Sequence, residues 1–213
     1  MMVFFMRCCK KTDACLKRRM SHIVWLLMPL LLILPMTVVQ AEGIQIKSFS
    51  LVATDKGYEM GFDSEIMLNA TLEQALEKGI VLYFVTKFSL IDSRWYWLND
   101  EVARSKYRVG LRYYALTRQY HLNTPLLSHS YNSLREALQA LGQLRAYPVD
   151  VKSELKWDAD YFASLRIWLD LTRMPKPFQV EALGSNQWNL SSEKLEWRMK
   201  LPAPEQPFYL KVQ

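Results

Sequence analysis

Cysteine, glycine and histidine are scarce in this sequence, and each scarcity excludes a class of chemistry. The three cysteines are Cys8, Cys9 and Cys15, so the chain beyond residue 15 offers no disulfide, no thiol nucleophile and no thiolate metal ligand. Seven scattered glycines form no glycine-rich phosphate-binding loop, and no G-x-S-x-G nucleophile elbow occurs. We therefore expect no catalytic residue and no cofactor.

The first 41 residues have the layout of an export signal. Six basic residues and one acidic residue precede an apolar run at residues 23–39, which is the order of a positive n-region and a hydrophobic h-region. The run closes on Val39-Gln40-Ala41, and we predict cleavage after Ala41. Because the run approaches the ~20 apolar residues of a spanning helix, an uncleaved apolar helix that serves as an N-terminal membrane anchor is the alternative. Both interpretations make residues 42–213 a single periplasmic domain.

The basic character of the chain belongs mostly to this leader. The formal net charge is +6, and removing the leader's six basic residues and one acidic residue from the totals of 27 and 21 leaves +1. A pI of about 9.2 would ordinarily suggest nucleic acid as a partner. The near-neutral domain excludes that partner, and inner-membrane association is expected only if the leader is retained.

Two histidines lie beyond the leader, and their spacing matches no metal site. His121 and His129 are eight residues apart across a turn at Pro125, unlike the helical histidine pair of a metalloprotease. Acidic residues on the outer face of a strand are usually solvated rather than catalytic. Such acids are Glu59, Asp63, Glu65, Asp158 and Asp160. We therefore expect neither a metal centre nor an acid–base pair.

Alternation of apolar and polar residues is the main structural pattern. It is clearest at residues 58–68 and recurs at 163–171 and 195–201, which predicts half-buried antiparallel strands. Residues 80–90 are apolar on both faces in their first half, as expected of a central strand. The apolar phase switches within residues 107–122, which predicts a β-bulge or a strand break near Tyr113, and the opening residues 44–51 switch similarly.

Two short helices interrupt the predicted strands. The first has Thr71 as its cap, with Gln74 completing a capping box and Gly79 as the stop. The second begins at Ser133 and ends at Gly142. These helices are too short and too few to be regular crossovers of a parallel sheet.

The predicted fold is mainly β, an antiparallel two-sheet sandwich that is immunoglobulin-like in outline and carries these two helices. The segment Met174-Pro175-Lys176-Pro177 leaves the sheet, because two prolines fix φ and remove amide donors. A rigid crossing between sheets is the first interpretation of this segment, and a proline-rich recognition loop is the second.

Several separated motifs occur together in this order. They are Gly79-Ile80-Val81-Leu82-Tyr83-Phe84, Arg94-Trp95-Tyr96-Trp97, Tyr113-Tyr114-Ala115-Leu116-Thr117-Arg118-Gln119-Tyr120, Pro175-Lys176-Pro177-Phe178-Gln179-Val180 and Trp188-Asn189-Leu190-Ser191-Ser192. With them the chain resembles the proteobacterial domain of unknown function 4390 family. The resemblance implies a Gram-negative exported protein with no catalytic residues to carry over. It also implies genes that often neighbour a membrane sensor kinase and its response regulator.

Two clusters of arginine and aromatic residues are the candidate interaction surface. Trp95 and Trp97 share one face of a predicted strand, and they either pack in the core or form an exposed platform. The second cluster consists of Arg112 and Arg118 with Tyr113, Tyr114 and Tyr120. These residue types are enriched at interface hot spots, although arginine stems also pack over sheets for structural reasons. The full candidate set is Arg94, Trp95, Tyr96, Trp97, Arg112, Tyr114, Arg118 and Tyr120.

These observations favour a non-enzymatic interaction module of the cell envelope. Its expected partner is an envelope or inner-membrane protein, with a sensor kinase as the leading candidate. The alternative is a ligand- or glycan-binding sandwich that uses the aromatic strand, and a hydrolase comes third.

Overall fold

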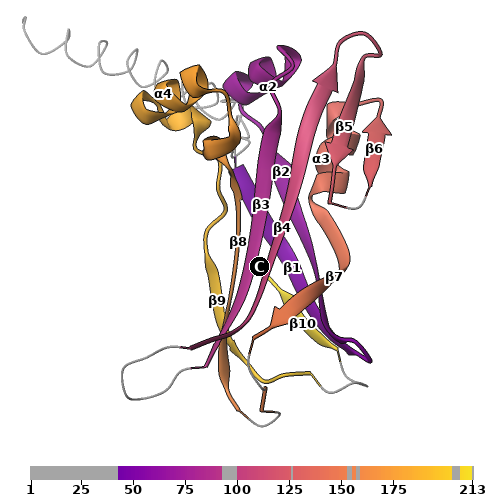
Figure 1. The fold of residues 1–213 in the computed structure, drawn as a ribbon, viewed down its shortest axis with the longest axis vertical. Helices are drawn as coiled ribbons and strands as arrows, with labels where there is room; N and C mark the ends of the chain where they lie inside the picture. The colour runs from indigo at the N-terminus through magenta and orange to yellow at the C-terminus, as the bar shows by residue number, and fades with distance from the viewer. Residues whose placement is uncertain are drawn as a thin grey trace, which may run out of the picture. The chain divides into compact units, whose positions relative to one another are not determined.

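A computed structural model describes residues 43–92, 100–125, 127–152, 155–156, 159–202 and 207–212. Within these residues the chain forms ten β-strands, three α-helices and two short 3-10 helices (Figure 1). The strands are β1 Gly43–Thr54, β2 Gly57–Met67, β3 Leu82–Asp92, β4 Asp100–Tyr114, β5 Gln119–Asn123, β6 Ser128–Tyr131, β7 Gln143–Val151, β8 Tyr161–Leu169, β9 Leu195–Met199 and β10 Phe208–Lys211. The helices are α2 Ala70–Glu77, α3 Leu134–Leu141, α4 Lys176–Gly184, η1 Leu171–Arg173 and η2 Asn186–Trp188.

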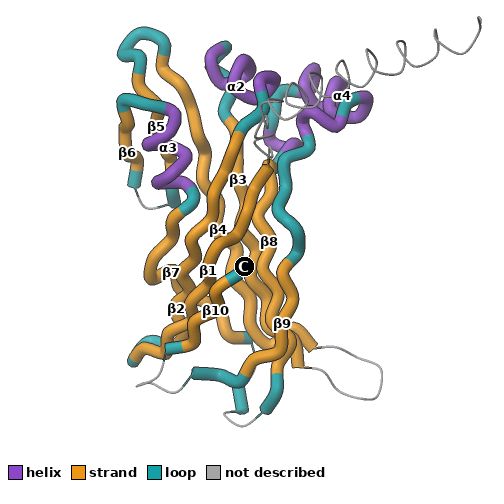
Figure 2. Tube along the Cα trace, turned by 180° about the vertical axis from the view of Figure 1, so that it is seen from behind, coloured by secondary structure: helices purple, strands orange, loops and turns teal. Residues whose placement is uncertain are grey.

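All strand pairings are antiparallel, and the strands follow the order β10-β1-β2-β7-β4-β3-β8-β9, with β5 and β6 added to β4. The prediction of a mainly β, antiparallel fold is confirmed. The strands form one connected, curled sheet (Figure 2). Its two halves meet where β4 pairs with β7 through Ala103↔Val151 and Arg104↔Asp150. The split into two separate sheets is not confirmed.

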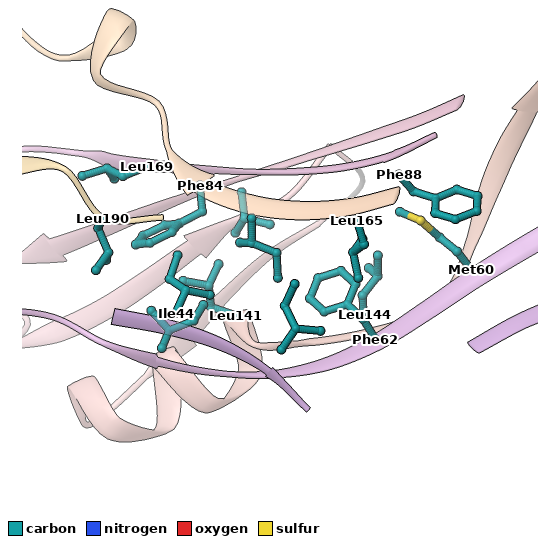
Figure 3. Packing of buried hydrophobic residues seen from close by; sticks show 14 of the residues in the cluster. Ile44, Met60, Phe62, Phe84, Phe88, Leu141, Leu144, Leu165, Leu169 and Leu190 are labelled. Atoms are coloured by element: carbon teal, nitrogen blue, oxygen red, sulfur yellow. The ribbon is translucent and has the colours of Figure 1, made fainter. Parts of the chain in front are cut away.

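The core lies on the concave side of the curled sheet, where strands that are not neighbours face each other (Figure 3). Phe49 of β1 stacks on Phe88 of β3 with ring centroids 4.9 Å apart, and the Trp197 ring of β9 lies 5.1 Å from Phe49. Full burial of one such side chain stabilises the fold by about 1.5–3 kcal/mol. The curled sheet therefore covers its own core, in the place that a second sheet would take in a sandwich.

The alternation in the sequence located the main strands correctly. Residues 58–67 of the predicted strand 58–68 belong to β2, and residues 195–201 contain β9. Residues 163–171 contain most of β8, although Leu171 already belongs to η1. The predicted central strand is β3, which lies between β4 and β8.

The two predicted phase irregularities have different causes. In β1 the register against β2 shifts between Ile46 and Ser48, which is the irregularity expected of the opening residues. Near Tyr113 the chain makes a strand break rather than a bulge, because β4 ends at Tyr114 and a turn leads into β5. Arg118 in this turn has a left-handed φ of 54°.

The two predicted helices exist, and one cap differs. Asn69, not Thr71, caps α2, because the Leu72 amide donates to the Asn69 side chain at 2.9 Å while the Thr71 hydroxyl donates to Gln187 at 3.0 Å. Gly79 follows the helix with a left-handed φ of 83°, as expected of a stop residue. For α3, the Ser133 cap is confirmed by the Glu136 amide, which donates to its hydroxyl at 3.2 Å.

Gly142 ends α3 as predicted, but not through a left-handed conformation. Its φ is −72°, and its carbonyl accepts a hydrogen bond from the Ser64 amide at 2.8 Å. A β-carbon at this position would lie 2.2 Å from the Ser64 carbonyl oxygen. Glycine is therefore required here by the close approach of β2.

The proline segment forms a helix that the sequence interpretation missed. Pro175 precedes the first residue of α4 and Pro177 lies in its first turn, where the missing amide has no helical acceptor in any case. The segment does leave the sheet, so that part of the prediction is right, but it starts a helix instead of forming a rigid crossing between sheets. None of the helices in the described part of the chain has the length and apolar character that crossing a bilayer requires.

Candidate functional site

The first aromatic cluster falls outside the described residues. Arg94, Trp95, Tyr96 and Trp97 lie between the end of β3 and the start of β4, within residues 93–99. Their role as an interaction platform therefore stays a prediction.

The second cluster lies on the β4–β5 hairpin, which divides its members between two faces. On one face, the Arg112 guanidinium carbon lies 4.6 Å from the centre of the Tyr114 ring, and His121 meets that ring edge-on at 4.5 Å. Arg112 and His121 are direct cross-strand neighbours. This face is exposed at Arg112 and Tyr114, so two of the predicted residues are available for contact.

The other predicted members lie elsewhere on the hairpin. Tyr120 packs against Tyr113 at 4.8 Å and borders the core. Burial raises the pKa of Tyr120 above 10.0, with smaller contributions from Tyr113, Glu77 and Glu73. Arg118 is exposed in the turn. The four residues Arg112, Tyr114, Arg118 and Tyr120 therefore do not converge on one site.

The two histidines are not brought together. His129 is the cross-strand neighbour of Leu122, while His121 is the neighbour of Ser130, so their side chains point to opposite faces of the hairpin. Among the residues that the structure describes, no group of three histidine, cysteine or acidic side chains could hold a metal ion. Within the same residues His121 makes its ring contact with Tyr114 and has no carboxylate partner.

Two of the three acidic residues of β2, Asp63 and Glu65, are engaged in structural contacts. Asp63 accepts hydrogen bonds from Ser48 at 2.9 Å and from Arg145 at 2.7 Å. Partial burial alone would raise the pKa of Asp63, but these hydrogen bonds and the charge of Arg145 lower it below 3.8. Glu65 pairs with Lys47 at 2.7 Å. Asp158, from the other predicted acidic pair, lies outside the described residues.

A row of three cations crosses the outer face of the sheet, and sequence reasoning missed it. Lys87 of β3 is the direct neighbour of Lys106 on β4 and of Arg166 on β8. All three are exposed, and direct cross-strand neighbours point to the same face. Arg108 lies in the next row on the same face, two residues beyond Lys106. In that row Val85 of β3 is paired with Arg108 on β4 and with Trp168 on β8. We call Lys87, Lys106, Arg108 and Arg166 the cationic face.

No acidic side chain of the described residues forms an ion pair with the cationic face. The ion pairs nearby involve other residues, since Lys152 pairs with Glu101 at 3.0 Å and Lys194 pairs with Glu196. Arg104 continues the stripe along β4, but its cross-strand neighbour on β7 is Asp150. Like charges placed directly opposite each other destabilise a sheet, so the uncompensated row has a cost to the fold.

A depression of about 520 Å³ lies beside this row. Its floor includes Ser89 and Ser164, which are buried and whose hydroxyl oxygens lie 2.8 Å apart. Lys87 and Arg166 line one part of it, together with Trp168, Asn189, Ser191 and Lys194. Glu101 also lines it, and its carboxylate pairs with Lys152 at 3.0 Å. Hydroxyl, amide and cationic donors surrounding an aromatic ring suit an anionic group that carries an apolar or sugar ring.

A second depression of about 300 Å³ adjoins Lys106 and Arg108. There the Tyr83 ring lies over Gly110, where a β-carbon would come within 3.1 Å of it. The Arg173 guanidinium carbon lies 5.4 Å from the centre of the same ring. Two depressions and the cations between them therefore form one continuous surface that is mainly basic.

One half of this surface was visible in the sequence. Arg104, Lys106 and Arg108 alternate along one strand, which places three cations on a single face. Lys87 and Arg166 join them only through the register of three strands that are distant in sequence, and register cannot be read from the alternation alone.

Comparison with known proteins adds the family. No curated protein and no solved structure is significantly similar to the chain. A family model described as "Domain of unknown function (DUF4390)" matches residues 41–198, which include the cationic face and the β4–β5 hairpin. The chain therefore belongs to this family, as its separated motifs indicated.

Proposed function

We propose that this protein is a non-enzymatic interaction domain of the periplasm that binds an acidic surface of another envelope protein through its cationic face. It is either released by cleavage after Ala41 or held at the inner membrane by an uncleaved leader. The observation that carries the proposal is the row Lys106, Lys87 and Arg166, which has no acidic partner among the described residues.

The spacing of the three cations indicates which kind of partner surface the row can bind. Three cations on three adjacent strands span two strand spacings, about 10 Å. Acidic side chains on one face of a helix or strand present carboxylates at comparable spacing, and charge complementarity of this kind accelerates association and selects partners. The leading candidate partner is the extracytoplasmic part of a sensor kinase, which the gene neighbourhood of the family supports.

The binding mode is tested with the full-length chain and a fluorescein-labelled peptide of alternating Asp and Glu. Lys87→Glu is expected to weaken binding about ten-fold, equivalent to about 1.4 kcal/mol, and added salt should weaken the wild type similarly. Lys56→Glu is the matched control, because it makes the same change of charge in the exposed β1–β2 turn. Equal losses in both variants would contradict a specific site.

The partner is tested in intact cells with a photo-crosslinking residue in place of Lys106. The expected product is a conjugate with the extracytoplasmic part of a sensor kinase. Recovery of no envelope protein, together with unchanged kinase signalling after deletion of the gene, would contradict the proposal.

A second candidate function is the binding of an acidic glycan, and the position of Trp168 favours it. This indole lines the 520 Å³ depression beside Arg166 and Asn189, an arrangement that can stack a sugar ring while pairing its carboxylate. Uronic acid oligosaccharides are the probe, and saturable quenching of tryptophan fluorescence that Trp168→Phe abolishes is the expected result. Quenching that persists in this variant would rule out the site.

A further inference from the structure

Three exposed apolar side chains lie at one end of the sheet. Leu116 in the β4–β5 turn is fully exposed, and Val180 and Leu183 of α4 are 69% and 89% exposed. Single exposed apolar residues are common on protein surfaces and need no explanation. These three residues call for an explanation, because they share an end of the domain with the first residue of β1.

Register and hydrogen bonds establish that shared end. Gly43, the first residue of β1, is paired with Met67, the last residue of β2, and α2 follows three residues later. The Asn69 side chain at the start of α2 donates to the Gln187 carbonyl at 2.6 Å, which ties η2 and the adjacent α4 to the same place. Leu111 is paired with Leu82 at the start of β3, so the hairpin beyond it extends past this end. Figure 1 shows α2, α4 and the hairpin together at the top of the view.

The orientation of α4 presents Val180 and Leu183 outward. Its inner side packs through Phe178, whose ring lies 5.6 Å from that of the buried Trp188. Val180 and Leu183 are three residues apart and therefore lie on one face of the helix. Lys176 is exposed one turn before Val180. Glu181 is exposed as well, so the outward apolar surface of α4 consists of Val180 and Leu183. The stem of a lysine beside such residues can extend toward lipid headgroups.

The short stretch of chain between the apolar run of the leader and β1 points to a bilayer as the surface that meets this end. The apolar run of the leader ends at residue 39, four residues before Gly43. Four extended residues reach about 14 Å at most. If the run lies in a bilayer, the end that carries Gly43 is held within that distance of the membrane surface.

We propose that this end of the domain rests on the bilayer, with Leu116, Val180 and Leu183 entering the interfacial region. The proposal concerns the membrane contact alone and does not depend on the cationic face. It rests on the alternative in which the leader is not cleaved, because a short tether and these exposed apolar residues together would fix the orientation of the domain. A single apolar helix of this size would bind only weakly without the tether.

The test uses the full-length chain in vesicles of phosphatidylethanolamine and phosphatidylglycerol, with Cys8, Cys9 and Cys15 replaced by serine. A spin label is placed at residue 116, 180 or 183, and collision with oxygen is compared with collision with a water-soluble nickel complex. The expected result is preferential collision with oxygen at all three positions. Val151 is the matched control position, since it is an exposed apolar residue where β7 meets the start of β4, and there the nickel complex should prevail.

Two outcomes would overturn the proposal. Preferential collision with the nickel complex at all three positions would mean that this end faces water. Protection from both reagents would mean that a protein surface, either a second copy or a partner, covers it. The double variant Val180→Glu and Leu183→Glu is expected to return the label at residue 116 to water. Both residues are exposed, so the near-UV circular dichroism of that variant should be unchanged, as should its affinity for the acidic peptide.

Discussion

Lys87 of β3 stands directly opposite Lys106 of β4, with both side chains on the outer face of the sheet. Their repulsion makes a prediction about stability as well as binding. Lys87→Thr is expected to raise the free energy of unfolding by about 0.5–1 kcal/mol, because it removes a like-charge neighbour and places a β-branched residue in a strand. Urea denaturation measures this change, and the same variant should bind the acidic peptide less tightly.

The control for that variant is Lys56→Thr, which lies in an exposed turn without a cross-strand cation. It should change neither stability nor binding appreciably. A loss of stability in Lys87→Thr would mean that the lysine stem contributes packing that outweighs the repulsion.

Gly142→Ala tests the contact between α3 and β2. The added β-carbon would lie 2.2 Å from the Ser64 carbonyl oxygen, so backbone must shift and the loss is expected to be roughly 2–3 kcal/mol. Gly184→Ala is the matched control, because it ends α4 with no atom within 4 Å of an added β-carbon. It should be neutral or slightly stabilising, and urea midpoints compare the two variants.

Ala146→Gly tests the bulge in β7. Arg145 and Ala146 lie between the residues paired with Met60 and Phe62, and Ala146 has a left-handed φ of 52°. Glycine adopts that conformation without steric cost, so the substitution is expected to stabilise the protein by up to about 1 kcal/mol. Ala140→Gly in α3 is the control and should destabilise by about 1 kcal/mol. Thermal denaturation distinguishes the two.

The ion pair of Asp63 predicts a pH dependence. The pKa of Asp63 is lowered in the folded protein, so its contribution to stability is present above the ordinary pKa near 4 and is lost as the pH falls through the folded value. Asp63→Asn should therefore be less stable than the wild type at pH 6, with the difference shrinking below pH 4.

Direct titration checks the cause of that shift. Arg145→Met should raise the pKa of Asp63 toward its ordinary value, as followed by carboxyl carbon NMR. The lowered value would need another explanation if it were unchanged in this variant.

Local patterns predicted most of the strands because half-buried antiparallel strands alternate in character. The α3 cap followed from sequence as well, since Ser133 occupies the position that its spacing predicted. The α2 cap did not, because Asn69 and Thr71 both have capping side chains and only the contact with Gln187 shows which one is used elsewhere. Prolines at the start of α4 were interpreted as ending regular structure, although they also fit a first helical turn.

The candidate site was harder to predict for a physical reason. Lys87 and Arg166 are 79 positions apart in sequence and become neighbours only when β3 pairs with β8. The tertiary register of the sheet, rather than any local motif, assembles the cationic face.

The short pairing between β4 and β7 has a mechanical consequence for the curled sheet. Strands elsewhere share ladders along much of their length, whereas this seam consists of two residue pairs. The sheet should therefore be most flexible at this seam, because a small opening there breaks few backbone hydrogen bonds. Side chains across the core keep the two halves of the sheet in contact during such an opening. Amides beside Ala103 and Val151 are therefore expected to exchange with solvent deuterium sooner than those of the β3–β8 ladder.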